Sequence, residues 1–186
     1  MKKKILLVCL IAILCVSVLA TLAYFNAEET TTNEISTGKV DMVLYELDAD
    51  GKEYFEGMNF ESVMPGDTFH KEPVIKNNDN TQPFYTRAKV LISITKDGQT
   101  LATNNYVSVN IGEAWVLGAD GWYYYKGVVE PGKTVSLFDT VNISKDMTNA
   151  YQGCNITVKI DAQAVQSKNN EVPGGDYTKI TGWPAE

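Results

Sequence analysis

Arg87–Ile94, RAKVLISI, and Asn155–Val165, NITVKIDAQAV, decide the fold class of this chain. In both stretches apolar and polar side chains alternate, so every second side chain lies on the same face of an extended strand. We expect these apolar faces to be buried against a hydrophobic core. The first face carries Ala88, Val90, Ile92 and Ile94, and the second carries Ile156, Val158, Ile160, Ala162 and Ala164.

Segments of the same character recur between residues 39 and 166, rich in Val, Ile, Thr, Tyr and Phe. Asp50-Gly51, Asp97-Gly98 and Asp120-Gly121 separate neighbouring segments and predict tight hairpin turns with positive φ. Residues 144–153 hold the one credible helical turn, which Ser144 would cap. The pattern predicts an all-β fold, an antiparallel β-sandwich of the jelly-roll type.

The N-terminus has the form of a secretory signal. Three lysines, Lys2 to Lys4, precede an apolar run from Ile5 to Leu22, and a polar stretch follows. We expect a signal-peptide helix that is cleaved between Ala23 and Tyr24. The run is also long enough for an uncleaved membrane anchor, which stays open as the alternative.

Removal of residues 1–23 takes away three lysines and no acidic residue, so the net charge of −7 becomes −10. This surface repels nucleic acid and anionic lipid headgroups, so we expect neither as a partner. We divide the chain into the signal peptide 1–23, an N-terminal segment 24–35, a β-sandwich domain 36–166 and a polar C-terminal tail 167–186. We expect this tail to be loosely held up to Trp183-Pro184, where it can dock. Cys154 is the one cysteine left after cleavage, so no disulfide can form within the processed chain. Strand alternation favours a buried apolar Cys154 over a reactive thiol.

The chain offers few parts for catalysis. His70 is the only histidine, so a zinc site with paired histidines cannot form within one chain, and no motif joins His70 to a nucleophile. We therefore expect no enzyme, no catalytic residue, no metal site and no cofactor. Asp48, Asp50 and Glu53 resemble the start of a calcium loop, but a hairpin turn explains them better; weak surface binding of calcium stays open.

The densest aromatic feature surrounds residues 121–125, GWYYY. Trp115, Trp122 and Tyr124 form a candidate glycan-binding surface, because aromatic rings stack on sugars. Alternation directs Trp122 and Tyr124 to one face and Tyr123 and Tyr125 to the other, so we expect at least half of these rings in the core.

Three blocks of the sequence resemble the TasA/camelysin family of exported proteins from Gram-positive spore formers. The blocks are residues 21–42 around the cleavage site, residues 64–80 and the closing strand at residues 151–166. Matching positions are Ala23, Phe25, Asn26, Thr37, Gly38, Val40 and Asp41, followed by Pro65, Gly66, Asp67, Lys71 and Asn77.

The resemblance implies processing by a dedicated signal peptidase of the SipW type, a jelly-roll sandwich, and a structural role in the extracellular biofilm matrix or at the cell surface. It also implies fibres in which each subunit donates its N-terminal segment to the sheet of the next, with Tyr24, Phe25 and Ile35 entering the neighbour. The partners would then be further copies of the chain and other matrix components. Two alternatives stay open: a monomeric glycan-binding adhesin, and a camelysin-like secreted metallopeptidase.

Overall fold

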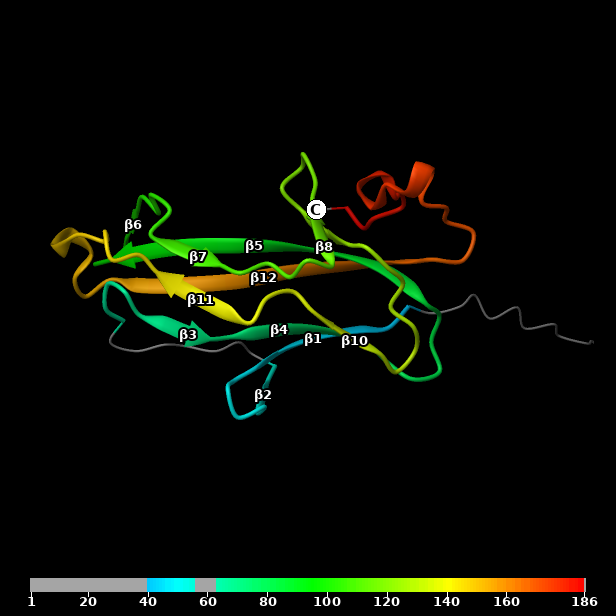
Figure 1. Ribbon diagram of the computed structural model, residues 1–186, viewed down its shortest axis with the longest axis horizontal. Coiled ribbons are helices and arrows are strands. Elements are labelled where there is room, and N and C mark those ends of the chain that lie inside the picture. Colours follow the sequence, from blue (N-terminus) through cyan, green and yellow to red (C-terminus); the bar gives the residue numbers. More distant parts are fainter. Residues whose placement is uncertain (1–39, 56–62, 186) are drawn as a thin grey trace, which may run out of the picture. The chain divides into compact units, whose positions relative to one another are not determined.

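A computed structural model describes residues 40–55 and 63–185. The signal segment 1–23 and the N-terminal segment 24–35 lie outside these residues. All strand pairings in the described residues are antiparallel, so the predicted all-β class is confirmed (Figure 1). The strands are β1 Met42–Leu47, β2 Glu53–Tyr54, β3 Thr68–His70, β4 Glu72–Asn77, β5 Phe84–Lys96, β6 Gln99–Leu101, β7 Val107–Val109, β8 Trp115–Leu117, β9 Tyr123–Tyr125, β10 Thr134–Ser136, β11 Thr140–Ile143 and β12 Asn155–Gln166.

One layer of the sandwich is built on the two longest strands. β5 and β12 pair without interruption from Thr95 opposite Asn155 to Phe84 opposite Gln166. The layer has the order β12-β5-β9-β8, and β6 pairs with the far end of β5. This layer contains both stretches whose alternation predicted the fold.

The facing layer contains a pair of long strands with a local irregularity. β3 and β4 continue one another, as do β10 and β11, because Asn142 faces Thr68 and Thr134 faces Lys76 in a single unbroken register. Between the named strands, the Lys71 N–H donates to the Asp139 carbonyl (3.1 Å), and the Leu137 N–H donates to the Pro73 carbonyl (3.0 Å). Proline has no N–H to return, which accounts for part of the interruption. β1 flanks the β4 half, and β7 flanks the β11 half.

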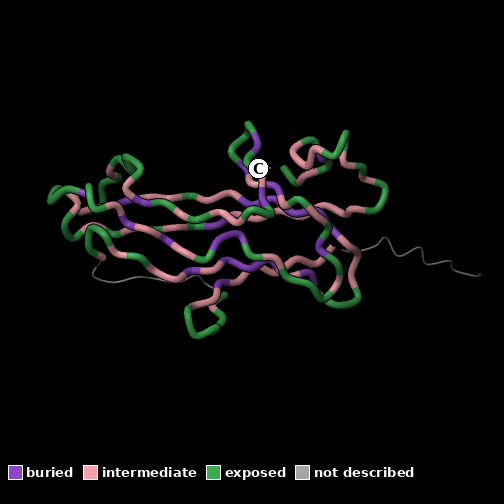
Figure 2. Tube along the Cα trace, in the orientation of Figure 1, coloured by how far each residue is buried: buried purple, intermediate pink, exposed green. Residues whose placement is uncertain are grey.

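The core lies between the two layers, and Figure 2 shows buried residues along the strands of both. The predicted apolar face of β5 is confirmed, with Ala88 and Ile94 fully buried and Val90 and Ile92 packed against the same cluster. The apolar face of β12 is confirmed in the same way, from Ile156 to Ala164. Cys154 also packs against this cluster but remains partly exposed.

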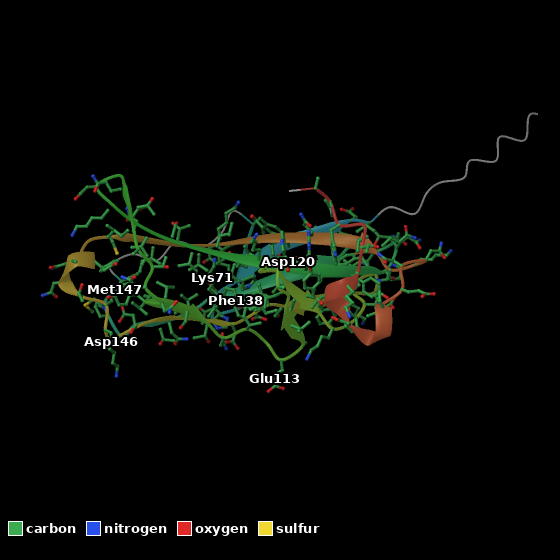
Figure 3. All side chains as sticks on the ribbon, turned by 90° about the horizontal axis from the view of Figure 1, so that it is seen from above. Lys71, Glu113, Asp120, Phe138, Asp146 and Met147 are labelled. Atoms are coloured by element: carbon green, nitrogen blue, oxygen red, sulfur yellow. The ribbon has the colours of Figure 1, made fainter. Side chains whose placement is uncertain are left out.

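The three Asp-Gly turns form where they were predicted. Gly51, Gly98 and Gly121 have φ angles of 76°, 77° and 81°, which favour glycine. The turn before β12 is shorter than expected: Ser144 Oγ accepts a bond from the Asp146 amide, but the helical part is one 3₁₀ turn, Asn149–Tyr151. This turn closes one end of the described unit, near Met147, whereas Lys71 and Phe138 lie midway along it (Figure 3).

The C-terminal residues 167–185 are docked, both at Trp183, where docking was expected, and before it, where the composition favoured a loosely held tail. Two 3₁₀ turns, Pro173–Gly175 and Tyr177–Lys179, bring the chain back over the outer face of the β5–β12 layer (Figure 1). Ile180 is buried, and the ring of Tyr177 meets that of Tyr85 edge to face at 6.1 Å. Tertiary packing on aromatic side chains therefore overrides a polar composition.

Lys71 is the largest fully buried side chain of the described residues, at 1% exposure. It lies at the irregularity between β3 and β4, and its ammonium forms an ion pair with Glu46 of β1, which is also buried. Removing two charges from water is expensive, and the mutual attraction of the pair offsets that cost.

We predict that Glu46→Gln lowers the free energy of unfolding by about 3–5 kcal/mol, because it leaves the Lys71 ammonium buried without its counter-charge. Urea denaturation of the variant, of Lys71→Met and of the double variant measures this. The double variant should be more stable than Glu46→Gln alone. Equal losses in Glu46→Gln and the double variant would contradict a coupled pair.

Candidate functional site

β12 lies at one end of the strand order β12-β5-β9-β8, so one of its edges faces away from β5. Ser167 N–H donates to the Pro83 carbonyl at 3.0 Å, continuing the register in which Gln166 faces Phe84. Residues that exchange hydrogen bonds alternate with residues that do not in an antiparallel pair. The odd-numbered residues of β12 therefore direct their backbone groups toward β5, and the even-numbered residues direct theirs away from it.

Within the described ranges no strand pairs with this second edge of β12, so the N–H and C=O groups from Ile156 to Ala164 have no ladder partner there. A long unpaired edge is a template for pairing with another strand. The same even-numbered residues carry the apolar side chains that face the core. A strand added here would therefore extend both the hydrogen-bonded layer and the core.

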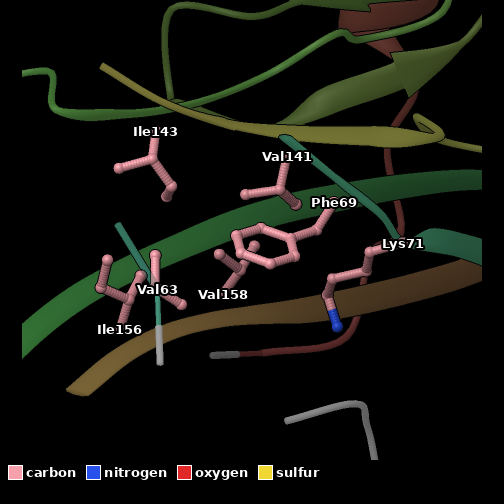
Figure 4. A pocket seen from close by; sticks show the side chains of 7 residues that line it. All are labelled: Val63, Phe69, Lys71, Val141, Ile143, Ile156 and Val158. Atoms are coloured by element: carbon pink, nitrogen blue, oxygen red, sulfur yellow. The ribbon is translucent and has the colours of Figure 1, made fainter. Parts of the chain in front are cut away.

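A small apolar gap between the two layers lies beside this edge. Its volume is about 10 Å³, room for about one water molecule. Figure 4 shows the aliphatic side chains pointing toward one another, with the Lys71 ammonium directed away from them at one end. The lining residues are Val63, Phe69, Lys71, Val141, Ile143, Ile156 and Val158.

The residues predicted for assembly and cleavage, Ala23, Tyr24, Phe25 and Ile35, lie outside the described residues. The structure therefore provides a candidate acceptor edge, and the donor segment stays a prediction. The sequence did not single out this edge, because alternation identifies the faces of a strand and not its neighbours.

The aromatic residues of the candidate glycan surface lie on two faces of one layer. Trp115 belongs to the core, where its ring lies 5.4 Å from that of Tyr125 and its Nε1 donates to the Ser136 carbonyl at 2.7 Å. Trp122 and Tyr124 are each 3% exposed and lie on the outer face, as alternation predicted. The structure thus does not bring Trp115 together with Trp122 and Tyr124.

On that outer face Arg87 organises a second, smaller cluster. Its guanidinium carbon lies 4.3 Å from the ring centre of Trp122 and 4.9 Å from that of Trp183, which the C-terminal segment supplies. The guanidinium donates to Asp120 (3.3 Å) and to the Tyr124 hydroxyl (3.1 Å), and it donates twice to Gln163 Oε1. The cluster therefore holds the hairpin, β12 and the C-terminal segment together.

This arrangement shifts the pKa values of Asp120 and Tyr124. Burial alone would raise the pKa of Asp120, but hydrogen bonds from the Tyr124 hydroxyl and the Trp122 amide, with the charge of Arg87, hold it below its ordinary value. Burial raises the pKa of Tyr124, and its hydrogen bond to Asp120 raises it further. At neutral pH the cluster therefore contains a charged Asp120 and a protonated Tyr124.

The carboxylate of Asp48, the first acidic residue of the calcium-loop pattern, accepts hydrogen bonds from residues of its own turn. Its carboxylate accepts hydrogen bonds from the amides of Asp50 (3.0 Å) and Lys52 (2.9 Å) and from the Tyr54 hydroxyl (3.0 Å). These bonds lower the pKa of Asp48, the Lys52 amide contributing most. Over residues 40–55 and 63–185, no three His, Cys, Asp or Glu side chains group closely enough to hold a metal ion.

His70, the only histidine of the sequence, lies near the carboxylates of Glu72 and Asp139. His70 Nε2 lies 3.8 Å from a Glu72 oxygen. Nearby, the Asp139 carboxylate accepts bonds from the Thr140 hydroxyl (2.5 Å) and from Asn110 Nδ2 (2.7 Å), which lower its pKa, and the neighbouring His70 adds to this effect.

Comparison of the chain with protein-family models, with curated proteins and with solved structures finds no match. None of the described residues belongs to a helix long and apolar enough to cross a membrane.

We predict that Trp183→Ala lowers the free energy of unfolding by about 2 kcal/mol, because Arg87 loses one of its two stacked indoles. The variant should also make Trp122 more accessible to acrylamide, as measured by fluorescence quenching. Trp183→Phe is the matched control, since it keeps an aromatic ring over Arg87. Unchanged quenching in Trp183→Ala would contradict docking of the C-terminal segment on this cluster.

Proposed function

We propose that this chain is an exported structural protein of the extracellular matrix or the cell surface, and that its copies join into fibres. Each copy lends residues 24–35, freed by cleavage between Ala23 and Tyr24, to the outer β12 edge of the next copy. The fold of each subunit is a jelly-roll sandwich. The resemblance to the TasA/camelysin family in three blocks supports this function.

The single observation that carries the proposal is the edge of β12 from Ile156 to Ala164, with which no strand of the described part of the chain pairs. Main-chain hydrogen bonds to a donated strand would supply affinity, and alternate side chains of the donor would contact the apolar gap. Tyr24, Phe25 and Ile35 are the apolar side chains proposed for this contact. Head-to-tail donation does not close on itself, so it yields a filament.

The alternative of a glycan-binding adhesin on Trp115, Trp122 and Tyr124 has less support. Trp115 packs in the core, and Trp122 and Tyr124 are stacked with Arg87, so little ring surface is left for a sugar. For the secreted metallopeptidase, no observation on the described residues favours a catalytic arrangement.

Deletion of residues 24–35 from the processed chain should abolish filaments, because the donor strand is then absent while the described domain is intact. Negative-stain electron microscopy and sedimentation of the exported protein measure the outcome. Addition of a synthetic 24–35 peptide should leave the truncated protein monomeric and occupy its edge. Filaments formed by the truncated protein would overturn the proposal.

Ala162→Pro tests the acceptor edge separately. The amide of Ala162 points away from β5, so proline removes an edge donor without breaking a β5–β12 hydrogen bond. We expect a folded protein that sediments as a monomer. Ala162→Ser keeps the amide and should still form filaments; equal assembly of both variants would exclude this edge as the acceptor.

A further inference from the structure

The outer face of the β5–β12 pair carries a row of cross-strand pairs. The register places Arg87 opposite Gln163, Lys89 opposite Asp161, and Leu91 opposite Lys159. The C-terminal segment covers the first pair through Trp183, 4.9 Å from the Arg87 guanidinium. Beside that covered pair lies a depression of about 460 Å³, within the size range of small-molecule sites. Its lining includes Lys89, Leu91, Trp122, Asp161 and Gln163.

The amide of Gln163 is oriented by Arg87. Its Oε1 accepts from Arg87 Nε (3.0 Å) and from a terminal guanidinium nitrogen (2.7 Å). Arginine can only donate, so the oxygen must face it and the NH₂ group must point elsewhere. No described residue accepts a hydrogen bond from this NH₂ group, so a donor of fixed position is available at the wall of the depression.

The two charged residues that line the depression, Asp161 and Lys89, have opposite charges. Asp161 offers a carboxylate acceptor, held by Lys159 Nζ at 2.9 Å. The Lys89 ammonium lies 5.4 Å from the ring centre of Trp122. One positive and one negative charge line the depression, together with the apolar side chain of the exposed Leu91.

We propose that this depression binds a neutral sugar unit of a polysaccharide. A sugar hydroxyl both donates and accepts, so it matches the Gln163 amide donor and the Asp161 carboxylate acceptor together. The C–H face of a sugar ring suits the exposed apolar side chain of Leu91. The site shares Trp122 with the aromatic surface expected from the sequence but is built mainly on side chains of β5 and β12, and it does not depend on fibre formation.

Two other ligand classes fit less well. A peptide strand would need unpaired backbone groups, but β5 and β12 pair with each other beneath the depression. A polyanion would meet balanced local charges on a chain of net charge −7. A neutral ligand that binds side chains alone needs neither unpaired backbone groups nor an excess of positive charge.

The test is a titration of the full chain, in a zwitterionic detergent, with neutral pentasaccharides of the cellulose, amylose, galactan and chitin types. Isothermal calorimetry measures binding, and tryptophan fluorescence reports on Trp122. Gln163→Glu keeps an oxygen for Arg87 but removes the NH₂ donor, and Asp161→Ala removes the acceptor. We expect at least one pentasaccharide to bind, and each variant to weaken it about tenfold.

Thr157→Ala, an exposed position on β12 outside the depression, is the matched control and should bind as the parent does. Urea midpoints close to that of the parent would show that the variants are folded. The proposal is overturned if none of the pentasaccharides binds, or if Gln163→Glu and Asp161→Ala both bind as tightly as the parent. Preferential binding of polygalacturonate or of a peptide library would overturn it as well.

Discussion

The rest of the described structure depends on the register of the β5–β12 pair. Twelve consecutive residues of each strand face one another, and a shift by one residue would turn the apolar side chains of one strand to the opposite face of the layer. The observed register places Ala88 and Ile160 in the core and Arg87 and Gln163 on the outer face. It also determines which backbone groups of β12 point to the open edge. The core, the arginine cluster, the sugar-sized depression and the candidate acceptor edge are therefore four consequences of one alignment.

The opposite layer tolerates an irregularity because two charges compensate each other inside it. The long strand that comprises β3 and β4 contains Pro73, which cannot donate, and Lys71, which would be costly to bury alone. Glu46 of β1 brings the counter-charge to the point where β1 leaves the layer. Beyond that point β3 continues without β1, and the apolar gap beside Phe69 opens between the layers. The buried ion pair and the candidate assembly edge are thus neighbours in the fold.

The two proposed activities use different parts of the same layer. Strand donation would engage the main chain along the edge of β12, whereas sugar binding would engage side chains on the face of β12 and β5. A subunit in a fibre could therefore still hold a polysaccharide, since the edge and the outer face do not overlap. This arrangement suits a matrix component, which must connect both to copies of itself and to the material around it.

Local sequence alone determined the strand faces, the Asp-Gly turns and the all-β class, because alternation and turn chemistry depend on neighbouring residues. It also separated Trp122 and Tyr124 from Tyr123 and Tyr125. The tertiary structure decided what those faces meet. Arg87 reaches Asp120 and Gln163, which are 33 and 76 residues away along the chain, and Trp183 comes from a segment whose polar composition predicts a loose tail. Such contacts depend on which strands become neighbours. No local pattern encodes that choice, since it is made by the burial of apolar surface over the whole domain.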